Sequence, residues 1–131
     1  RASMRRQIQR LTNLLKIIIS IIITILSKMV KYVESEGEWM ALMNEEKLVV
    51  VDFTASWCGP CQMVAPHFEA MSKEYTNVIF VKVDVDNQDK IAQMCGVRAM
   101  PTFQFFKGGK KVDELMGADV ATLKSKVAAL A

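Results

Sequence analysis

The pattern of apolar positions changes repeatedly along the chain from residue 30 onward. Leu48–Phe53 is a nearly continuous run of β-branched residues, as expected for a strand buried on both faces. Val78–Val83 and the shorter Val30–Val33 are further strand candidates. Glu36–Glu46 and Cys61–Tyr75 instead carry apolar residues at helical spacing. Strands and helices are therefore expected to alternate. The expected inner face of the second helix includes Met63, Val64, Phe68 and Met71.

The following segment predicts a third helix and a β-hairpin. Asn87 is placed to cap a helix over Gln88–Cys95. Thr102–Phe106 and Lys110–Leu115 are runs suited to strands, and they flank Gly108-Gly109, a pair typical of a hairpin turn.

A final helix, which Asp119 is placed to cap, completes the order βαβαβαββα. This order predicts the α/β class, with a central mixed sheet, helices on both faces and an antiparallel hairpin at the end. The apolar face of the final helix consists of Val120, Leu123, Val127 and Leu130.

Charge divides the chain into two unlike parts. Residues 1–28 carry six Lys and Arg and no acid, a formal charge of +6, whereas residues 29–131 carry a formal charge of −3. We therefore expect a basic, Ile-rich N-terminal extension over 1–28 and one globular domain over 29–131. The lysines of the domain are scattered among acids, so they do not indicate a nucleic-acid partner.

The extension allows several interpretations. Membrane association through residues 11–28 is one, although eleven uncharged residues between Lys16 and Lys28 are about half of the roughly 20 that a spanning helix needs. A basic start before a short apolar run also fits a secretory signal, and an acid-free start with arginines fits a mitochondrial transit peptide. Because Met29 opens a stretch that reads as a complete domain, the extension could also be an artefact or dispensable.

Two of the three cysteines form a C-x-x-C pair, Cys58 and Cys61, which points to redox or metal chemistry. The pair lies where the strand over Leu48–Phe53 ends and a helix begins, the edge at which open α/β sheets place their sites. Unpaired N–H groups and the helix dipole stabilise a thiolate there. The spacing i, i+3 lets the two sulfurs close a small ring, which Pro60 stiffens and Gly59 allows to turn tightly.

The residues around the pair add to this interpretation. Trp57 supplies an apolar flank beside the reactive sulfur. Asp52 lies on a strand of valines and phenylalanine, where burial is expected to raise the pKa of its carboxyl group. A zinc site would need four ligands. Besides the pair, Cys95 and His67 are the remaining candidates, and they form no second paired motif, so the sequence disfavours a zinc site.

Four short blocks carry a resemblance to a known family. On these blocks the chain from about residue 30 to residue 131 resembles the thioredoxin family, in particular its small eukaryotic cytosolic type. The resemblance covers about four-fifths of the chain and implies the thioredoxin fold. The blocks are Val50–Cys61 (VVDFTASWCGPC), Lys82–Asp86 (KVDVD), Met100–Phe103 (MPTF) and Gly117-Ala118.

The resemblance also implies roles for individual residues. Cys58 is expected to be the exposed nucleophile that forms a mixed disulfide with the substrate, and the less exposed Cys61 is expected to resolve it. Asp52 would accept the proton of the resolving cysteine, with Lys82 nearby to tune it. A cis-proline loop at Met100-Pro101 would offer backbone hydrogen bonds to an extended substrate. The implied substrate groove consists of Trp57, Gly59, Pro60, Met100, Pro101, Gly117 and Ala118.

The implied activity is the reduction of protein disulfides through the Cys58–Cys61 dithiol, since Gly59-Pro60 between the cysteines resembles reducing members of the family. The resemblance implies no bound cofactor and no metal. It implies disulfide-containing proteins as substrates and recharging by a thioredoxin reductase, a flavoprotein that draws on NADPH. It also implies a cytoplasmic location.

Two other functions stay open. The chain could be a membrane-tethered or secreted thioredoxin-like oxidoreductase, or a mitochondrial one, if residues 1–28 are a genuine targeting segment. It could also be a non-catalytic binding module that docks a partner on the thioredoxin surface, with the cysteines as bystanders.

Overall fold

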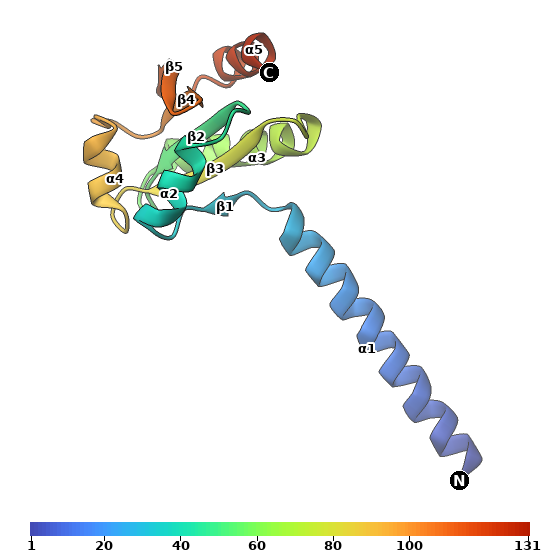
Figure 1. Ribbon diagram of the computed structural model, residues 1–131. Coiled ribbons are helices and arrows are strands. Elements are labelled where there is room, and N and C mark those ends of the chain that lie inside the picture. The colour runs from blue at the N-terminus through green and yellow to red at the C-terminus, as the bar shows by residue number, and fades with distance from the viewer.

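One five-stranded sheet forms the centre of the globular part of the chain (Figure 1). The computed structural model describes residues 1–25 and 29–131. The strand order is β1-β3-β2-β4-β5; the first three strands are parallel, and β4 and β5 are each antiparallel to the preceding neighbour. This arrangement confirms the predicted mixed sheet and its terminal hairpin. The strands are β1 (Lys31–Tyr32), β2 (Val49–Thr54), β3 (Ile79–Asp84), β4 (Thr102–Lys107) and β5 (Lys110–Met116).

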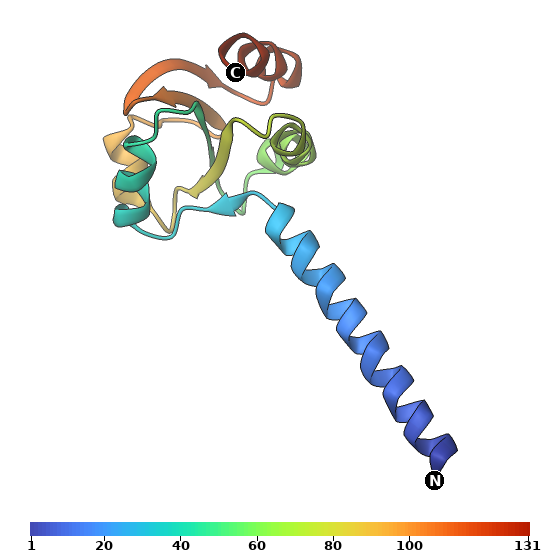
Figure 2. The same ribbon diagram turned by 45° about the vertical axis from the view of Figure 1, so that its right-hand side comes forward.

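Helices cover both faces of the sheet, as Figure 2 shows, and this also confirms the prediction. Apolar side chains of α3 and α5 pack in one hydrophobic cluster with one face of the sheet, and those of α2 and α4 pack in a second cluster with the other face. The helices of the domain are α2 (Glu36–Met43), α3 (Gly59–Glu74), α4 (Asp89–Met94) and α5 (Val120–Leu130).

Strand β2 is the central strand, and all six of its residues are buried. Because side chains alternate along a strand, Val50 contributes to the cluster beneath α3 while Val51 and Phe53 contribute to the opposite one. Asp52 therefore belongs to the face that α3 covers. The strand ends at Thr54, four residues before Cys58, so the fold delivers the C-x-x-C pair to the carboxyl edge of the sheet.

Two local predictions were wrong. Asn87 does not cap α4: the N-cap is Gln88, and its side chain makes no capping hydrogen bond. The carboxylate of Asp84 instead accepts hydrogen bonds from the backbone N–H groups of Asp86 and Asn87, so Asn87 belongs to the turn that precedes the helix. Met63 does not lie on the inner face of α3 but is strongly exposed, because Cys61, Val64, Phe68 and Met71 already complete the buried stripe at helical spacing. The predicted cap of Asp119 on α5 is confirmed, since its side chain accepts from the N–H of Thr122.

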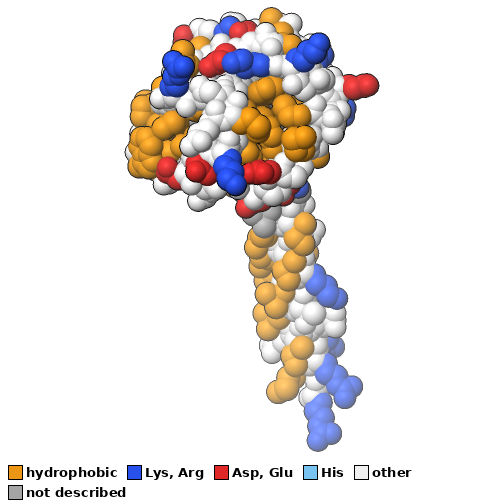
Figure 3. Space-filling model, turned by 60° about the vertical axis from the view of Figure 1, so that its left-hand side comes forward, with side chains coloured by type: hydrophobic (Ala, Val, Ile, Leu, Met, Phe, Trp, Pro, Cys, Tyr) orange, Lys and Arg blue, Asp and Glu red, His pale blue; other side chains and the backbone are white. Residues whose placement is uncertain are grey.

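Helix α1 (Ala2–Lys28) precedes this domain and extends away from it in Figure 1. All of its described side chains, residues 2–25, are exposed. Figure 3 shows that hydrophobic side chains gather along one side of α1 and basic side chains along another. The last part of the expected membrane segment, residues 26–28, lies outside the described residues.

Candidate active site

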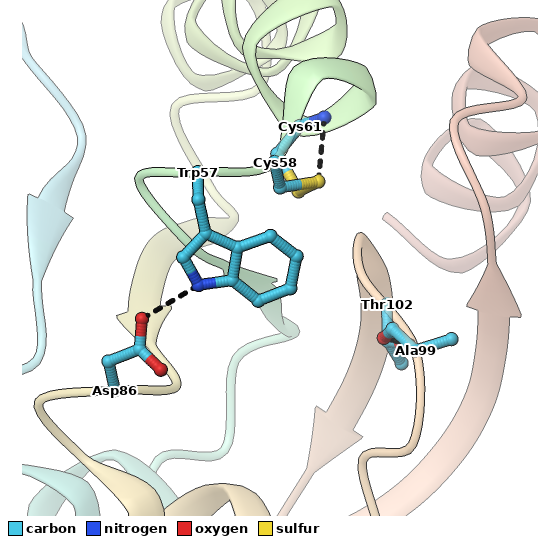
Figure 4. The surroundings of a disulfide bond; sticks show 6 residues. All are labelled: Trp57, Cys58, Cys61, Asp86, Ala99 and Thr102. Atoms are coloured by element: carbon cyan, nitrogen blue, oxygen red, sulfur yellow. Dashed lines mark hydrogen bonds between the residues drawn. A yellow bond between two sulfur atoms is a disulfide. The ribbon is translucent and has the colours of Figure 1, made fainter.

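A disulfide bond between Cys58 and Cys61 lies at the N-terminal end of α3 (Figure 4). Cys58 is the N-cap residue, and its Sγ accepts a hydrogen bond of 3.2 Å from the backbone N–H of Cys61. Pro60 occupies the first turn, where a missing N–H leaves no hydrogen bond unmade. The two Cα atoms are 5.3 Å apart, within the range that a disulfide requires. Both sulfurs are therefore held at the positive end of a helix dipole.

Burial of the two cysteines differs from the expectation in one respect. Cys58 was expected to be exposed, yet as a residue it is only 5% exposed, and Cys61 is 2% exposed. In the oxidised form both pack in a small cluster with Ala55 and Met100. The predicted order of exposure is retained, because Cys58 is the more accessible of the two cysteines.

Trp57 forms an apolar platform directly before the first cysteine. It is 67% exposed, and its indole Nε1–H donates a hydrogen bond of 3.0 Å to Oδ2 of Asp86 (Figure 4). Asp86 was not singled out in the sequence, although it lies in the KVDVD block directly after β3. The hydrogen bond fixes the orientation of a large exposed side chain next to the disulfide.

The loop before β4 lies on the other side of the disulfide. The Met100-Pro101 peptide bond is cis, as the resemblance implied, and Met100 packs against the cysteines. The carbonyl oxygen of Pro101 accepts a hydrogen bond of 2.8 Å from the N–H of Gly117. Gly117 has φ +94°, a conformation that a residue with a Cβ rarely adopts. Glycine at this position therefore joins the loop to the end of β5.

Asp52 is almost completely buried, with 1% of its surface exposed. Burial raises the pKa of its carboxyl group from 3.8 to about 7, and the positive charge of Lys82 opposes this rise in part. Its Oδ1 has no hydrogen-bond partner among the described residues. The predicted increase in pKa is thus confirmed, and the group changes its charge close to neutral pH.

Lys82 is buried beside this carboxyl group rather than facing solvent. It pairs in register with Asp52 across β2 and β3. Its Nζ also lies 3.4 Å from Oε1 of Glu69 on α3, whose Oε2 accepts the N–H of Val30 at 2.9 Å. The sequence contained no signal for Glu69, because its contacts join segments that are far apart in the chain.

Comparison with known proteins decides the family. The family model described as Thioredoxin matches residues 30–129. The chain belongs to the thioredoxin family. Thioredoxin of Equus caballus is 50% identical over 104 residues, which cover 78% of this chain and 99% of the relative. Thioredoxin of Homo sapiens is 48% identical over 101 residues, which cover 76% of this chain and 96% of the relative.

Solved structures of thioredoxins superimpose on the same region. Plasmodium falciparum thioredoxin has a TM-score of 0.76 and 42% identity, with 78% of this chain and 100% of that structure covered. Fasciola hepatica thioredoxin has a TM-score of 0.74 and 41% identity, with 79% and 100% covered. The fold is therefore the thioredoxin fold, as expected.

Family membership and the disulfide at the helix start together establish the activity. Thioredoxins are protein-disulfide reductases that use a redox-active disulfide in place of a bound cofactor. This thioredoxin-family chain is accordingly a thiol–disulfide oxidoreductase, and Cys58 and Cys61 form its redox-active pair. The alternative of a non-catalytic binding module is not favoured. Disulfide-containing proteins and a thioredoxin reductase are the partners that membership of the family implies in general.

Two further residues with metal-binding side chains lie apart from the thioredoxin site. His67 is exposed on α3. Cys95 is half-buried and outside the disulfide, and burial raises the pKa of its thiol to about 11 against an opposing effect of Lys111. Within the described ranges, no group of three or more His, Cys, Asp or Glu could hold a metal ion.

Proposed function

We propose that the chain reduces protein disulfides with Cys58 as the attacking thiolate and Cys61 as the resolving thiol. The Cys58 thiolate attacks one sulfur of the substrate disulfide, which forms a mixed disulfide and releases the other substrate sulfur as a thiolate. The Cys61 sulfur then attacks Cys58 Sγ, closes the internal disulfide and releases the second substrate thiolate. The observation that carries this assignment is the position of Cys58 as N-cap of α3, where helix N–H groups favour its anionic form.

Asp52 is the proposed base that takes the proton from Cys61 before the second step. A base works best when its pKa lies near the operating pH, and burial brings the pKa of Asp52 to about 7. The unpartnered Oδ1 of Asp52 also leaves an acceptor free inside the protein. Lys82 acts through Asp52, because its charge lowers the pKa of that carboxyl group and keeps it from rising further.

The proposed substrate groove lies between Trp57 and the loop of Met100-Pro101. Trp57 offers an exposed apolar surface, and Gly59 and Pro60 bring the backbone close to the disulfide without bulky side chains. Gly117 and Ala118 form the opposite rim, where Gly117 is joined to Pro101 by a backbone hydrogen bond. An extended substrate segment would bind here through its backbone.

We further propose a cytoplasmic protein that a flavoprotein thioredoxin reductase recharges with electrons from NADPH. Gly59-Pro60 between the cysteines supports the reducing direction. Secretion, a membrane span or mitochondrial import remains the alternative if α1 is a targeting segment. The mass of the mature N-terminus, together with fractionation of the cell, distinguishes these locations.

Insulin reduction tests the assignment of the two cysteines. Cys58→Ser is expected to abolish turnover, whereas Cys61→Ser is expected to accumulate mixed disulfides that mass spectrometry detects. Cys95→Ser is the matched control, and it should keep the turnover of the unmodified chain because Cys95 lies outside the disulfide. Turnover that survives Cys58→Ser would contradict the proposal.

A further inference from the structure

Helix α1 presents two faces of opposite character (Figure 3). One face is apolar. Its residues recur at alternating spacings of four and three, which keeps them on one side of the helix. Leu14, Ile19 and Ile21 widen this face, and all of these side chains are exposed. The members of the apolar face are Met4, Ile8, Leu11, Leu15, Ile18, Ile22 and Ile25.

The opposite face is polar over most of the length of the helix, although Ile17 and Ile23 are exposed beside Ser20 and Thr24 and narrow the polar face next to the domain. Gln9 donates a hydrogen bond of 3.0 Å from Nε2 to Oδ1 of Asn13, one turn further along. Ser20 and Thr24 continue this face towards the domain, and the Thr24 hydroxyl donates to the Ser20 carbonyl oxygen. The basic residues lie on or beside the polar face, and no acidic residue offsets them. They are Arg5, Arg6, Arg10 and Lys16.

A membrane span is a poor use of this helix, although Ala2–Ile25 is long and apolar enough for one by length and composition. Spanning would put Lys16, near the middle of the helix, and the polar face around it into hydrocarbon. The stretch from Leu11 to Ile25 covers about 22 Å as a helix, less than the roughly 30 Å of a bilayer core. A helix lying in the interface has neither problem, because its polar face stays in water.

A second copy of the chain is also a poor partner for the apolar face. The spacing of four and three residues would suit a coiled coil, but a coiled coil usually carries charged pairs beside its seam. Here the flanking positions include Leu14, Ile19 and Ile21, so the apolar face is wider than a two-helix seam would bury. Two copies would also bring basic helices together without an acid to compensate. An anionic lipid surface can bury the whole width of the apolar face, and its headgroups complement the positive charge of α1.

We propose that α1 lies in the plane of an anionic lipid surface, with its apolar face in the headgroup and acyl boundary, and tethers the thioredoxin domain there. The ligand is a bilayer that contains acidic phospholipid, and the arginines and Lys16 contact its headgroups. The cytoplasmic leaflet carries such lipids, which agrees with a cytoplasmic domain. The disulfides of proteins at that surface would then be the substrates within reach. The tether is independent of the chemistry of the cysteines.

Vesicle sedimentation with the full chain tests the proposal. The chain should sediment with phosphatidylcholine vesicles that contain phosphatidylserine, and much less with phosphatidylcholine alone. Replacing Arg5, Arg6 and Arg10 by Gln should weaken binding roughly fivefold for each residue. Added salt should weaken it further.

A matched pair of double variants separates the apolar face from the polar one. Ile18→Gln with Ile22→Gln should weaken vesicle binding by at least about tenfold, because each isoleucine loses apolar burial in the membrane. Asn13→Gln with Ser20→Gln puts the same residue on the polar face and should leave binding within about twofold. The rate of insulin reduction in solution should be the same in all of these variants, because α1 does not touch the active site.

Three outcomes would overturn the proposal. Binding that does not depend on phosphatidylserine would remove the role of the basic residues. Oriented circular dichroism of the bound chain should show a helix parallel to the membrane, and a perpendicular helix would establish a span instead. Self-association in analytical ultracentrifugation without any vesicle binding would show that a second copy covers the apolar face.

Discussion

The ammonium nitrogen of Lys82 lies 3.4 Å from Oε1 of Glu69, although Lys82 pairs in register with the buried Asp52. One cation therefore faces two carboxyl groups: one nearly sealed inside the sheet face and one partly exposed on α3. The positive charge of Lys82 is therefore shared between Glu69 and Asp52. This arrangement is consistent with burial outweighing the cation in setting the pKa of Asp52.

Glu69→Gln is expected to lower the pKa of Asp52 below about 7. The substitution removes a nearby negative charge and leaves Lys82 to compensate Asp52 alone, and both effects favour the ionised carboxylate. The pKa of Asp52 should fall by less than about one pH unit, because Glu69 is partly exposed to solvent. Carbon-detected NMR titration of the Asp52 carboxyl in the oxidised protein measures it.

Glu74→Gln is the control for this experiment, since Glu74 lies on the same helix but is exposed. It should leave the titration of Asp52 unchanged. An increase in the pKa of Asp52 in Glu69→Gln, or an equal shift in both variants, would show that Glu69 does not position Lys82.

Asp52→Asn is expected to stabilise the oxidised protein at pH 8 relative to its effect at pH 4. The folded state holds the proton of Asp52 up to a pKa of about 7, whereas the unfolded chain releases it near 3.8. Between these values the folded protein binds more protons, so its stability falls as the pH rises from about 4 to about 7 and is constant above. Asparagine does not ionise, so the variant escapes this loss.

The gain of Asp52→Asn over that pH range should reach at most about 4 kcal/mol, from three pKa units at 1.36 kcal/mol each. Guanidinium unfolding at pH 4, 6 and 8 measures the difference between variant and parent. Parallel stability curves would mean that the carboxyl group is already ionised in the folded protein at pH 6. The same variant should slow insulin reduction, because Cys61 loses its base.

Cys95 is expected to resist alkylation in the folded, reduced protein. Burial raises the pKa of its thiol to about 11, so its thiolate fraction at neutral pH is roughly a hundredfold below that of a free cysteine. Iodoacetamide at pH 7 followed by peptide mass spectrometry should find Cys58 modified well before Cys95. Unfolded protein, in which all three cysteines react, is the control. Equal rates at Cys58 and Cys95 in the folded protein would refute both the proposed activation and the effect of burial.

The hairpin glycines provide a matched pair for stability. Both Gly108 and Gly109 have positive φ, at +57° and +78°. A Cβ on Gly109 would lie 2.6 Å from the backbone oxygen of Met43, whereas one on Gly108 would meet nothing within 4 Å. Gly108→Ala should cost about 1 to 2 kcal/mol for the backbone conformation alone, and Gly109→Ala should cost at least about 2 kcal/mol more. Equal losses in denaturant unfolding would show that the turn can move away from α2.

Much of the fold could be predicted from the sequence, because its signals are local. The β-branched run that became β2 and the capping acid Asp119 depend on neighbours within a few residues. The errors arose where two local signals competed. Asn87 resembles a cap, but the carboxylate of Asp84 binds its N–H in the preceding turn. Met63 is apolar, but the face of α3 that meets the sheet is already complete without it.

The redox pair is also a property of the sequence alone. Cys58 and Cys61 are three residues apart at the start of a helix, and that spacing brings their sulfurs within bonding distance. The surroundings of the pair were decided by the tertiary structure. Trp57 is held by Asp86, Pro101 by Gly117 and Lys82 by Glu69, and each contact joins segments that only the folded sheet brings together. Hydrophobic periodicity specifies which face of an element is buried, but the polar partners across that face depend on how the elements pack.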